Sequence, residues 1–297
     1  MTSTNYDAKF RPQSGTPIAG PIDVRQLRRS TMRRRCFPFR LAISLFSAAV
    51  FSSVTLTPTA VAQNLLPIQV TITQQVQAIP DPPNPTSDPI NVVPFEFDPF
   101  GTNLVRATWM TGIGCPTNAT TSDGTNSSPF TDPACLTGDP KDNRNQGLLL
   151  AKTGPTANFA AAGAKLVGPG AKGVVLTELG YDLRKPMAPT DPRGSHCGAG
   201  APRFNVVTSD GVNHFVGCNS PPAAFTPTTS TGWIRLRWGA GQLAAAFPPI
   251  LPGSVASSIS IIFDEGQDAS GGPDEFGLAV LDNIDVNGTL AGRGPGT

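Results

Sequence analysis

Short segments rich in β-branched and aromatic residues recur between residues 69 and 286, and turn-forming residues separate them. In residues 69–78 apolar and polar side chains alternate, which is the pattern of a strand with one buried face. The tract 80–85 holds four prolines. It cannot supply the N–H donors of a sheet ladder, so it is expected to be a connector. No long segment shows the period of an amphipathic helix, so the chain is expected to be all-β.

The same pattern predicts further strands at 91–97, 104–110, 148–152, 175–184, 233–238, 257–263 and 278–286. Residues 159–165 are rich in alanine and fit either a helical turn or a strand. Residues 116–134 are rich in Ser, Thr, Asn, Asp, Pro and Gly, and they are expected to form a loop. About ten short strands joined by long polar loops favour a two-sheet antiparallel β-sandwich with jelly-roll-like connections.

Charge is distributed unevenly along the chain. Residues 1–62 contain nine basic and two acidic residues, whereas residues 63–297 contain 13 basic and 19 acidic ones. The basic segment leads into an apolar stretch at 41–51 and then a small-residue pattern that ends at Ala62, the three regions of a secretory signal peptide. We expect an export leader over 1–62, cleaved after Ala62, with Met32 as the true start. An uncleaved anchor is the alternative, and a faint twin-arginine motif leaves the export route open.

The part of the chain after the leader is expected to form one domain. Residues 63–100 supply an N-terminal strand and the proline-rich connector, and residues 101–297 form the remainder of the sandwich. The acidic balance and the lack of a basic cluster argue against nucleic acid as a partner. No later apolar stretch is long enough to span a membrane. The expected location is secreted, periplasmic or in the cell envelope.

The cysteines after the leader are even in number: Cys115, Cys135, Cys197 and Cys218. An even number in an exported chain indicates disulfides. Pairing of sequence neighbours, Cys115 with Cys135 and Cys197 with Cys218, closes the shortest loops and is our prediction. The alternative is a zinc site built from His196, His214 and the cysteines beside them. The chain lacks the usual zinc-ligand spacings, and oxidation competes with metal binding outside the cytoplasm.

Residues 203–218 have the pattern of a β-hairpin. Two runs of β-forming residues flank Asp210 and Gly211, a pair that favours a two-residue type I′ turn. Such a turn would place Arg203 opposite Cys218.

The strand predicted at 233–238 has two distinct faces. The core face holds Ile234, Leu236 and Trp238. Trp233, Arg235 and Arg237 share the other face, where an exposed indole could stack on a sugar ring and the guanidinium groups could bind hydroxyl or carboxylate oxygens. These three residues are the candidate ligand-binding residues. The alternative is that Arg235 stacks on Trp233 or pairs with Glu178 or Asp182 on a neighbouring strand.

Residues 264–275 contain five carboxylates within 12 residues. Asp264, Asp268 and Glu275 stand at positions 1, 5 and 12 of an EF-hand loop, but positions 3 and 6 hold a glycine and an alanine, and the flanks read as strands. This excludes an EF-hand. A looser calcium site made of several loop oxygens and a solvated acidic loop remain as alternatives.

Asp282 interrupts an apolar pattern. Uninterrupted alternation over 278–286 puts its carboxylate on the same face as Val280 and Ile284, which points it toward the core. A buried charge must be paired, hydrogen-bonded or metal-bound. A bulge at Asp282 and Asn283 would reverse this facing.

The runs 259–265 and 281–288 resemble the closing strands of secreted bacterial jelly-roll modules, including carbohydrate-binding ones. The resemblance implies a polysaccharide or cell-surface glycan as partner. In some of these modules an aspartate of the last strand helps to hold a structural calcium ion, which implies that role for Asp282. Together with the acidic loop this gives three metal candidates: Asp264, Asp268 and Asp282. The alternative for Asp282 is a carboxylate that caps loop amides.

Motifs of common enzyme classes are absent from the sequence, among them G-x-S-x-G, H-E-x-x-H, the Walker loop and the dinucleotide fingerprint. A glycosidase carboxylate pair cannot be recognised by spacing because its geometry is three-dimensional. The sequence therefore favours an exported, non-catalytic β-sandwich that binds extracellular carbohydrate or a cell-surface polymer. Two alternatives remain: a structural or surface-interaction protein without a small ligand, and a secreted hydrolase that uses Asp and Glu.

Overall fold

The computed structural model describes residues 79–122, 124–186, 194–197, 201–267 and 277–297. All of these belong to one compact unit, residues 57–297, and the other unit, residues 1–56, lies outside them. The predicted leader over 1–62, the predicted strand over 69–78 and the metal candidate Asp268 also lie outside the described residues, so they stay predictions.

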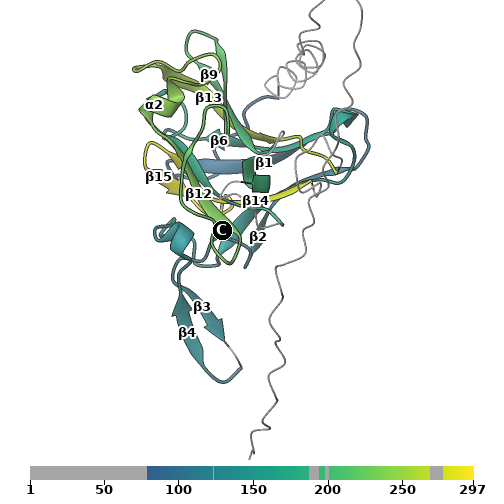
Figure 1. The fold of residues 1–297 in the computed structure, drawn as a ribbon. Coiled ribbons are helices and arrows are strands. Elements are labelled where there is room, and N and C mark those ends of the chain that lie inside the picture. The colour runs from purple at the N-terminus through teal and green to yellow at the C-terminus, as the bar shows by residue number, and fades with distance from the viewer. Residues whose placement is uncertain (1–78, 123, 187–193, 198–200, 268–276) are drawn as a thin grey trace, which may run out of the picture. The chain divides into compact units, whose positions relative to one another are not determined.

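Short strands are the main regular elements of the described chain (Figure 1). The strands are β1 (Asn91–Phe97), β2 (Val105–Thr111), β3 (Ala119–Ser122), β4 (Ser127–Phe130), β5 (Gln146–Lys152), β6 (Ala161–Val167), β7 (Val174–Val175), β8 (Leu179–Arg184), β9 (Arg203–Thr208), β10 (Asn213–Gly217), β11 (Ala224–Phe225), β12 (Trp233–Trp238), β13 (Val255–Phe263), β14 (Leu278–Val286) and β15 (Thr289–Ala291). The helical elements are the 3₁₀ turns η1 (Pro133–Cys135), η2 (Thr156–Asn158) and η3 (Gly194–Cys197) and the short helix α2 (Ala240–Leu243). The proline tract 80–85 is irregular, as predicted.

Two antiparallel sheets pack face to face. Sheet A has the strand order β1-β6-β13-β9-β10, and β7 also pairs with β13. Sheet B has the order β11-β12-β8-β14-β5-β2, and β15 also pairs with β14. Neighbours such as β1 and β6, or β8 and β14, are far apart in sequence, because the chain crosses repeatedly between the sheets. The predicted jelly-roll-like β-sandwich is confirmed.

The main core fills the space between the sheets. At its centre the rings of Tyr181, Phe204 and Trp238 lie 5.3 to 5.8 Å apart. Trp238 Nε1 donates to the carbonyls of Gly217 and Pro221, both at 3.1 Å, and the Tyr181 hydroxyl donates to a backbone carbonyl. The large rings therefore bury apolar area while their polar atoms stay hydrogen-bonded. The predicted core facing of Ile234, Leu236 and Trp238 is confirmed.

The alanine-rich segment 159–165 becomes a strand because of its position. β6 lies between β1 and β13, so both of its edges are paired. A Cβ on Gly163 would lie 2.5 Å from the Phe95 ring of β1, so the large ring packs directly over this small residue. Strand pairing on both sides overrides the helical propensity of alanine.

The strand predicted over 175–184 is two strands in different sheets. β7 pairs with β13 in sheet A, and β8 pairs with β12 and β14 in sheet B. Asn287 fixes the segment between β7 and β8, where the chain passes from sheet A to sheet B. Its Oδ1 accepts hydrogen bonds from the backbone N–H groups of Thr177 at 2.7 Å and Glu178 at 3.1 Å. Val175, at the end of β7, is 48% exposed.

The β9–β10 hairpin forms as predicted, but its register is shifted by one residue. Arg203 lies opposite Gly217. The reason is a three-residue loop: Thr208 N donates to Val212 O at 3.0 Å, and Gly211 adopts a φ of +81°. The left-handed glycine is the third residue of this loop. A two-residue turn lacks this residue, so the register predicted from it is off by one.

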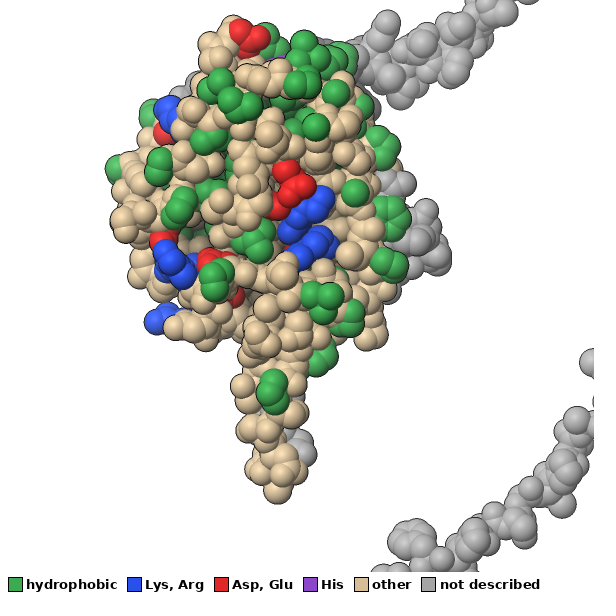
Figure 2. Space-filling view, turned by 90° about the vertical axis from the view of Figure 1, so that its left-hand side faces the viewer, with side chains coloured by type: hydrophobic (Ala, Val, Ile, Leu, Met, Phe, Trp, Pro, Cys, Tyr) green, Lys and Arg blue, Asp and Glu red, His purple; other side chains and the backbone are tan. Residues whose placement is uncertain are grey.

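The segment 116–134, expected to be a loop, contains a second hairpin. β3 and β4 pair with each other and with neither large sheet. Figures 1 and 2 show this hairpin as a narrow projection from the sandwich. All four residues of β4 are exposed. The expectation of a loop was wrong here, because the apolar and polar pattern carries little information for a strand such as β4 that has no buried residue.

Candidate functional site

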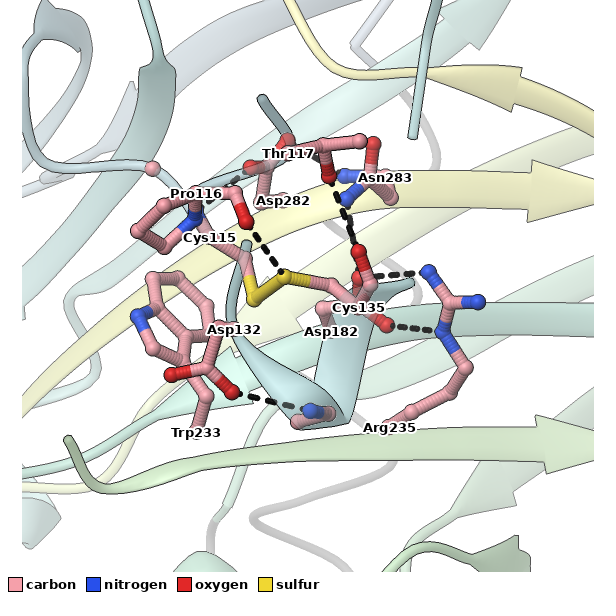
Figure 3. The surroundings of a disulfide bond; sticks show 12 residues. Cys115, Pro116, Thr117, Asp132, Cys135, Asp182, Trp233, Arg235, Asp282 and Asn283 are labelled. Atoms are coloured by element: carbon pink, nitrogen blue, oxygen red, sulfur yellow. Dashed lines mark hydrogen bonds and ion pairs between the residues drawn. A yellow bond between two sulfur atoms is a disulfide. The ribbon is translucent and has the colours of Figure 1, made fainter. Parts of the chain in front are cut away.

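A disulfide-bonded loop covers part of the outer face of sheet B (Figure 3). Cys115 and Cys135 are bonded with their Cα atoms 6.2 Å apart, as predicted. Trp233 of β12 packs with these cysteines, Ala134 and Val280, and only 1% of its surface is exposed. The prediction that Trp233 presents its indole to solvent was therefore wrong. Alternation identified the outer face of β12, but it could not show that a distant loop lies over this face.

Arg235 fastens the same loop to the sheet. Its Nε and Nη2 donate to the two carboxylate oxygens of Asp182 at 2.7 and 2.9 Å, and its Nη1 donates to Thr137 Oγ1 at 2.8 Å. Asp182 is fully buried and also accepts a hydrogen bond from Asn283 Nδ2 at 2.8 Å. The alternative expectation, that Arg235 pairs with Asp182 on the neighbouring strand, is confirmed.

Arg237 belongs to a second charged group on this face. Its Nε lies 3.1 Å from Asp285 Oδ2, and Asp285 Oδ1 accepts a hydrogen bond from Gly288 N at 2.7 Å. Burial raises the pKa of Asp285 to about 6; Arg237 opposes this rise, and a hydrogen bond with the Glu178 carboxyl adds to it. Burial and the neighbouring Glu178 carboxyl thus oppose the charged form of Asp285, and Arg237 favours it.

A β-bulge decides where Asp282 points. The register of β14 against β8 shifts between Asp282 and Asp285, and Asn283 has a φ of +45°. The core-facing residues are Ala279 and Leu281 before the bulge and Ile284 and Val286 after it. Asp282 lies opposite Asp182, on the outer face of sheet B. The prediction from uninterrupted alternation was wrong, and the alternative with a bulge is confirmed.

The bulge joins two loops to the sheet. Asp282 Oδ2 accepts a hydrogen bond from Cys115 N at 2.7 Å, so this carboxylate caps a loop amide. Asn283 Oδ1 accepts one from Asp139 N at 2.9 Å. Gly114 makes the approach possible, because a Cβ there would lie 2.1 Å from the carbonyl oxygen of Gln146. The bulge thus holds the loop before β3 and the loop before β5 side by side.

A pocket of about 540 Å³ opens beside this bulge. Its walls come from the bulge, from the base of the β3–β4 hairpin and from the loop between η1 and β5. The side chains that line it are chiefly amides, carboxylates and hydroxyls: Thr117, Asn118, Thr120, Asp139, Asp142, Asn143, Asn145, Asp282 and Asn283, with Arg144 and Phe130. We call this cavity the bulge pocket.

Carboxyl groups lie close together in the bulge pocket. Burial raises the pKa of Asp142, and the neighbouring Asp139 adds to this effect. Burial also raises the pKa of Asp282 well above its ordinary value, with further contributions from Asp182 and Asp142. Burial and mutual repulsion therefore make these groups hold protons more readily than free carboxyl groups do, and a carboxyl group can exchange hydrogen bonds with hydroxyl groups in either form.

Of the metal candidates, the structure describes Asp264 and Asp282, and these two have different partners. Arg203 donates to both oxygens of Asp264 at 2.7 and 2.9 Å, which neutralises this carboxylate in a different place from Asp282. Among the described residues, the group of metal-ligating atoms close to one another is Cys115, Asp132 and Cys135. Both of its sulfur atoms form the disulfide, so they are not free thiolate ligands.

The residues of the zinc alternative have other partners. Cys197 and Cys218 form the second predicted disulfide, with Cα atoms 5.1 Å apart. His196 Nε2 lies 2.8 Å from Gly232 O. The ring nitrogens of His214 lie 2.8 Å from Pro248 O and 2.9 Å from Thr208 Oγ1. The two histidines fasten loops in different parts of the sandwich.

Most residues of the bulge pocket were not identified from the sequence. Asp139, Asp142, Asn143 and Arg144 lie in a polar connector that has no recognised motif. The one available signal was the density of Asp and Asn between Gly138 and the next strand, which predicts turns as readily as a site. Their function as walls of a pocket depends on the distant bulge in β14.

Comparisons with known proteins find similarity in three-dimensional structure only. No protein-family model and no curated protein sequence matches the chain. A family 11 carbohydrate-binding module of the cellulosomal cellulase Lic26A-Cel5E of Clostridium thermocellum is 11% identical, with a TM-score of 0.31 over 71% of this chain and 94% of the module. A second structure of a C. thermocellum family 11 module, with a β-1,3-1,4-mixed-linked tetrasaccharide, is 14% identical, with a TM-score of 0.31 over 67% of this chain and 90% of the module.

The enzymatically active domain of tailspike protein 4 of bacteriophage CBA120 is also similar, at 9% identity and a TM-score of 0.31 over 70% of this chain. The match spans 20% of the tailspike chain. Separately, none of the helices in the described part of the protein has the length and apolar character needed to cross a bilayer.

Proposed function

We propose that this chain is an exported, non-catalytic β-sandwich protein that binds extracellular carbohydrate or a cell-surface polymer in the bulge pocket. The chemistry of the pocket carries the proposal. Its volume of about 540 Å³ falls within the range of small-ligand sites. Such sites are usually lined by apolar side chains, whereas this one is lined by polar groups and a single aromatic ring.

The lining matches a ligand rich in hydroxyl groups. Amide side chains such as Asn143 both donate and accept, the carboxylates accept, and Arg144 donates in a fixed geometry. Phe130 is 37% exposed and can present a ring face to the apolar side of a sugar. An apolar ligand would remove water from these polar groups without adding hydrogen bonds, which costs free energy.

The residues first considered as ligand contacts are proposed instead to support the walls of the pocket: Trp233, Arg235 and Arg237. Trp233 packs under the disulfide loop, and Arg235 donates to Thr137, the residue before Gly138 in the pocket wall. Arg237 holds Asp285 on the strand that carries the bulge.

Two disulfides support the proposed export. Disulfides persist in oxidising compartments and are rare in the cytosol. A leader that ends at Ala62 would deliver the chain to such a compartment.

Binding of purified full-length protein to a panel of polysaccharides tests this function. We expect wild-type protein to bind at least one glycan, and Phe130→Ala and Arg144→Ala each to weaken this binding about tenfold, which is about 1.4 kcal/mol. Phe225→Ala is the matched control, because Phe225 is an equally exposed phenylalanine (40%) outside the pocket lining. This variant should bind as wild type does.

Two outcomes would overturn the proposal. One is that wild-type protein binds no glycan on the panel, and the other is that both pocket variants bind as tightly as Phe225→Ala. A reducing-end assay on the bound glycan tests the non-catalytic part. Release of sugar would favour the hydrolase alternative.

A further inference from the structure

A second cavity, of about 430 Å³, opens on sheet A where β13 changes its neighbour. β13 pairs with β7 up to Ala256 and with β6 from Ile259 onward. Ser257 and Ser258 lie between these two ladders, and the register of β13 against β9 also shifts here. Both serines line the cavity, together with the end of β6, the turn after β6 and part of the proline tract 80–85. We call this cavity the β13 pocket.

Two lysines share one carboxylate beside the β13 pocket. Lys165 Nζ donates to Asp81 Oδ1 at 3.3 Å, and Lys172 Nζ donates to Asp81 Oδ2 at 3.1 Å. The side chain of Lys165 is only 3% exposed. A buried ammonium group needs a nearby opposite charge, so Asp81 is required to neutralise Lys165. Among the described residues that line the β13 pocket, Asp81 and Lys172 are the charged ones, so the charge of Lys172 is left in excess.

The β13 pocket also offers polar groups that are available to a ligand. The side chain of Lys172 is 61% exposed, and its ammonium group has three N–H donors, of which Asp81 uses one. Asn84 is exposed, and it accepts a hydrogen bond from Asn91 at 2.6 Å through Oδ1, which leaves its Nδ2 to donate. Within the described part of the chain, the hydroxyl of the half-buried Ser258 has no hydrogen-bond partner.

These donors favour a ligand that carries an acid group. Hydrogen bonds from an ammonium group to a carboxylate or sulfate oxygen are charge-assisted and stronger than neutral ones. The volume of about 430 Å³ is much larger than a single sulfate or phosphate ion and falls within the range of small-ligand sites. A sugar unit with an acid group fits both properties, because its hydroxyl groups can pair with Ser258 and Asn84 while Lys172 holds the acid group.

We propose that the β13 pocket is a second binding site, which takes an acidic sugar that carries a carboxylate or a sulfate group. The site is separate from the bulge pocket, because the described lining residues of the two pockets do not overlap. The bulge pocket borders a strand of sheet B, whereas the β13 pocket borders sheet A. The proposal therefore goes beyond the function of the bulge pocket and does not depend on it.

Titration calorimetry of the full-length protein with four trisaccharides tests the proposal. The probes are a galacturonate trisaccharide, a guluronate trisaccharide, sulfated maltotriose and neutral maltotriose. At least one acidic trisaccharide should bind about fivefold more tightly than maltotriose, and added salt should reduce this difference. The identity of the acidic trisaccharide that binds distinguishes a carboxylate ligand from a sulfate ligand.

Charge variants locate the binding. Lys172→Gln should weaken binding of the acidic trisaccharide about fivefold, whereas Lys172→Arg, which keeps the charge, should retain most of it. Arg106→Gln is the matched control, because Arg106 is similarly exposed (69%), lies on β2 and does not line the pocket. Ser258→Ala provides an independent variant without a change in charge, and it should weaken binding about threefold through the loss of one hydrogen bond.

Three outcomes would overturn the proposal. The first is that no acidic trisaccharide binds more tightly than maltotriose. The second is that Lys172→Gln and Arg106→Gln bind the acidic trisaccharide equally well. The third is that Phe130→Ala, in the bulge pocket, abolishes this binding, which would place the acidic sugar there instead. Failure of the bulge pocket to bind any glycan would overturn the proposed function and leave the β13 pocket as a site.

Discussion

At the scale of single residues, Asp285 is paired with Glu178, and the charge of Asp285 depends on pH. The native protein keeps the Asp285 proton up to about pH 6, whereas the ordinary pKa is 3.8. The native state therefore binds more protons than the unfolded state between these values, so the free energy of unfolding falls as the pH rises through this window. Glu178→Gln removes one acid of the pair. It should lower the pKa of Asp285 and reduce this fall, as measured by urea unfolding at several pH values from 4 to 7.

Glu96→Gln is the control for this measurement, because Glu96 is an exposed residue of β1 in the other sheet; its carboxylate accepts a hydrogen bond from Ala107 N at 3.1 Å and lies 3.4 Å from Arg106. This variant should show the pH dependence of wild type. If Glu178→Gln and Glu96→Gln gave the same pH profile, Glu178 would not raise the pKa of Asp285.

Trp233 yields a prediction about stability. Because its indole is buried between the disulfide loop and β14, Trp233→Ala should lower the free energy of unfolding by about 3–5 kcal/mol. Trp233→Phe keeps much of the apolar volume and should cost less. Urea unfolding of both variants measures the difference. A normal unfolding curve for Trp233→Ala would mean that the side chain is exposed in solution.

At the scale of elements, the two disulfides provide a matched comparison. Their loops have nearly equal lengths, with sequence separations of 20 and 21, so each should contribute about 3 kcal/mol by constraining the unfolded chain. Only the Cys115–Cys135 bond fixes the base of the β3–β4 hairpin. We expect Cys115→Ser/Cys135→Ser to become sensitive to proteolysis within 118–131, and Cys197→Ser/Cys218→Ser to stay resistant there. Equal cleavage of both variants at the hairpin would show that the disulfide does not hold it.

The elements also show what the sequence could predict. β1, β12 and β14 begin and end where alternation placed them, because each has one face against the main core. The β3–β4 hairpin was missed because it pairs with neither large sheet and all four residues of β4 are exposed, so no apolar period marks it in the sequence. The facing of Asp282 could not be predicted either, since a single bulge residue with a positive φ, Asn283, reverses it.

At the scale of the whole molecule, the sandwich brings together segments that are distant in sequence. Cys115 N and Asp282 are 167 positions apart and hydrogen-bonded. The disulfide pairing could be predicted because it follows from chain proximity and compartment. The pocket could not, because it exists only where the loop before β5, the hairpin base and the β14 bulge meet. Among the candidate ligand-binding residues of β12, Trp233 lies under the disulfide loop, and Arg235 donates to Thr137 beside it.

The most direct test of ligand binding in the bulge pocket is a titration of isotope-labelled protein with an oligosaccharide of the glycan that it binds, followed by backbone amide chemical shifts. We expect the largest shift changes at residues that line the pocket: Asn118, Phe130, Asn143, Arg144 and Asn283. The amide shift of Phe225, which lies outside the pocket lining, should stay unchanged. Shifts centred on another part of the sandwich, with the bulge pocket unchanged at saturation, would contradict binding in this pocket.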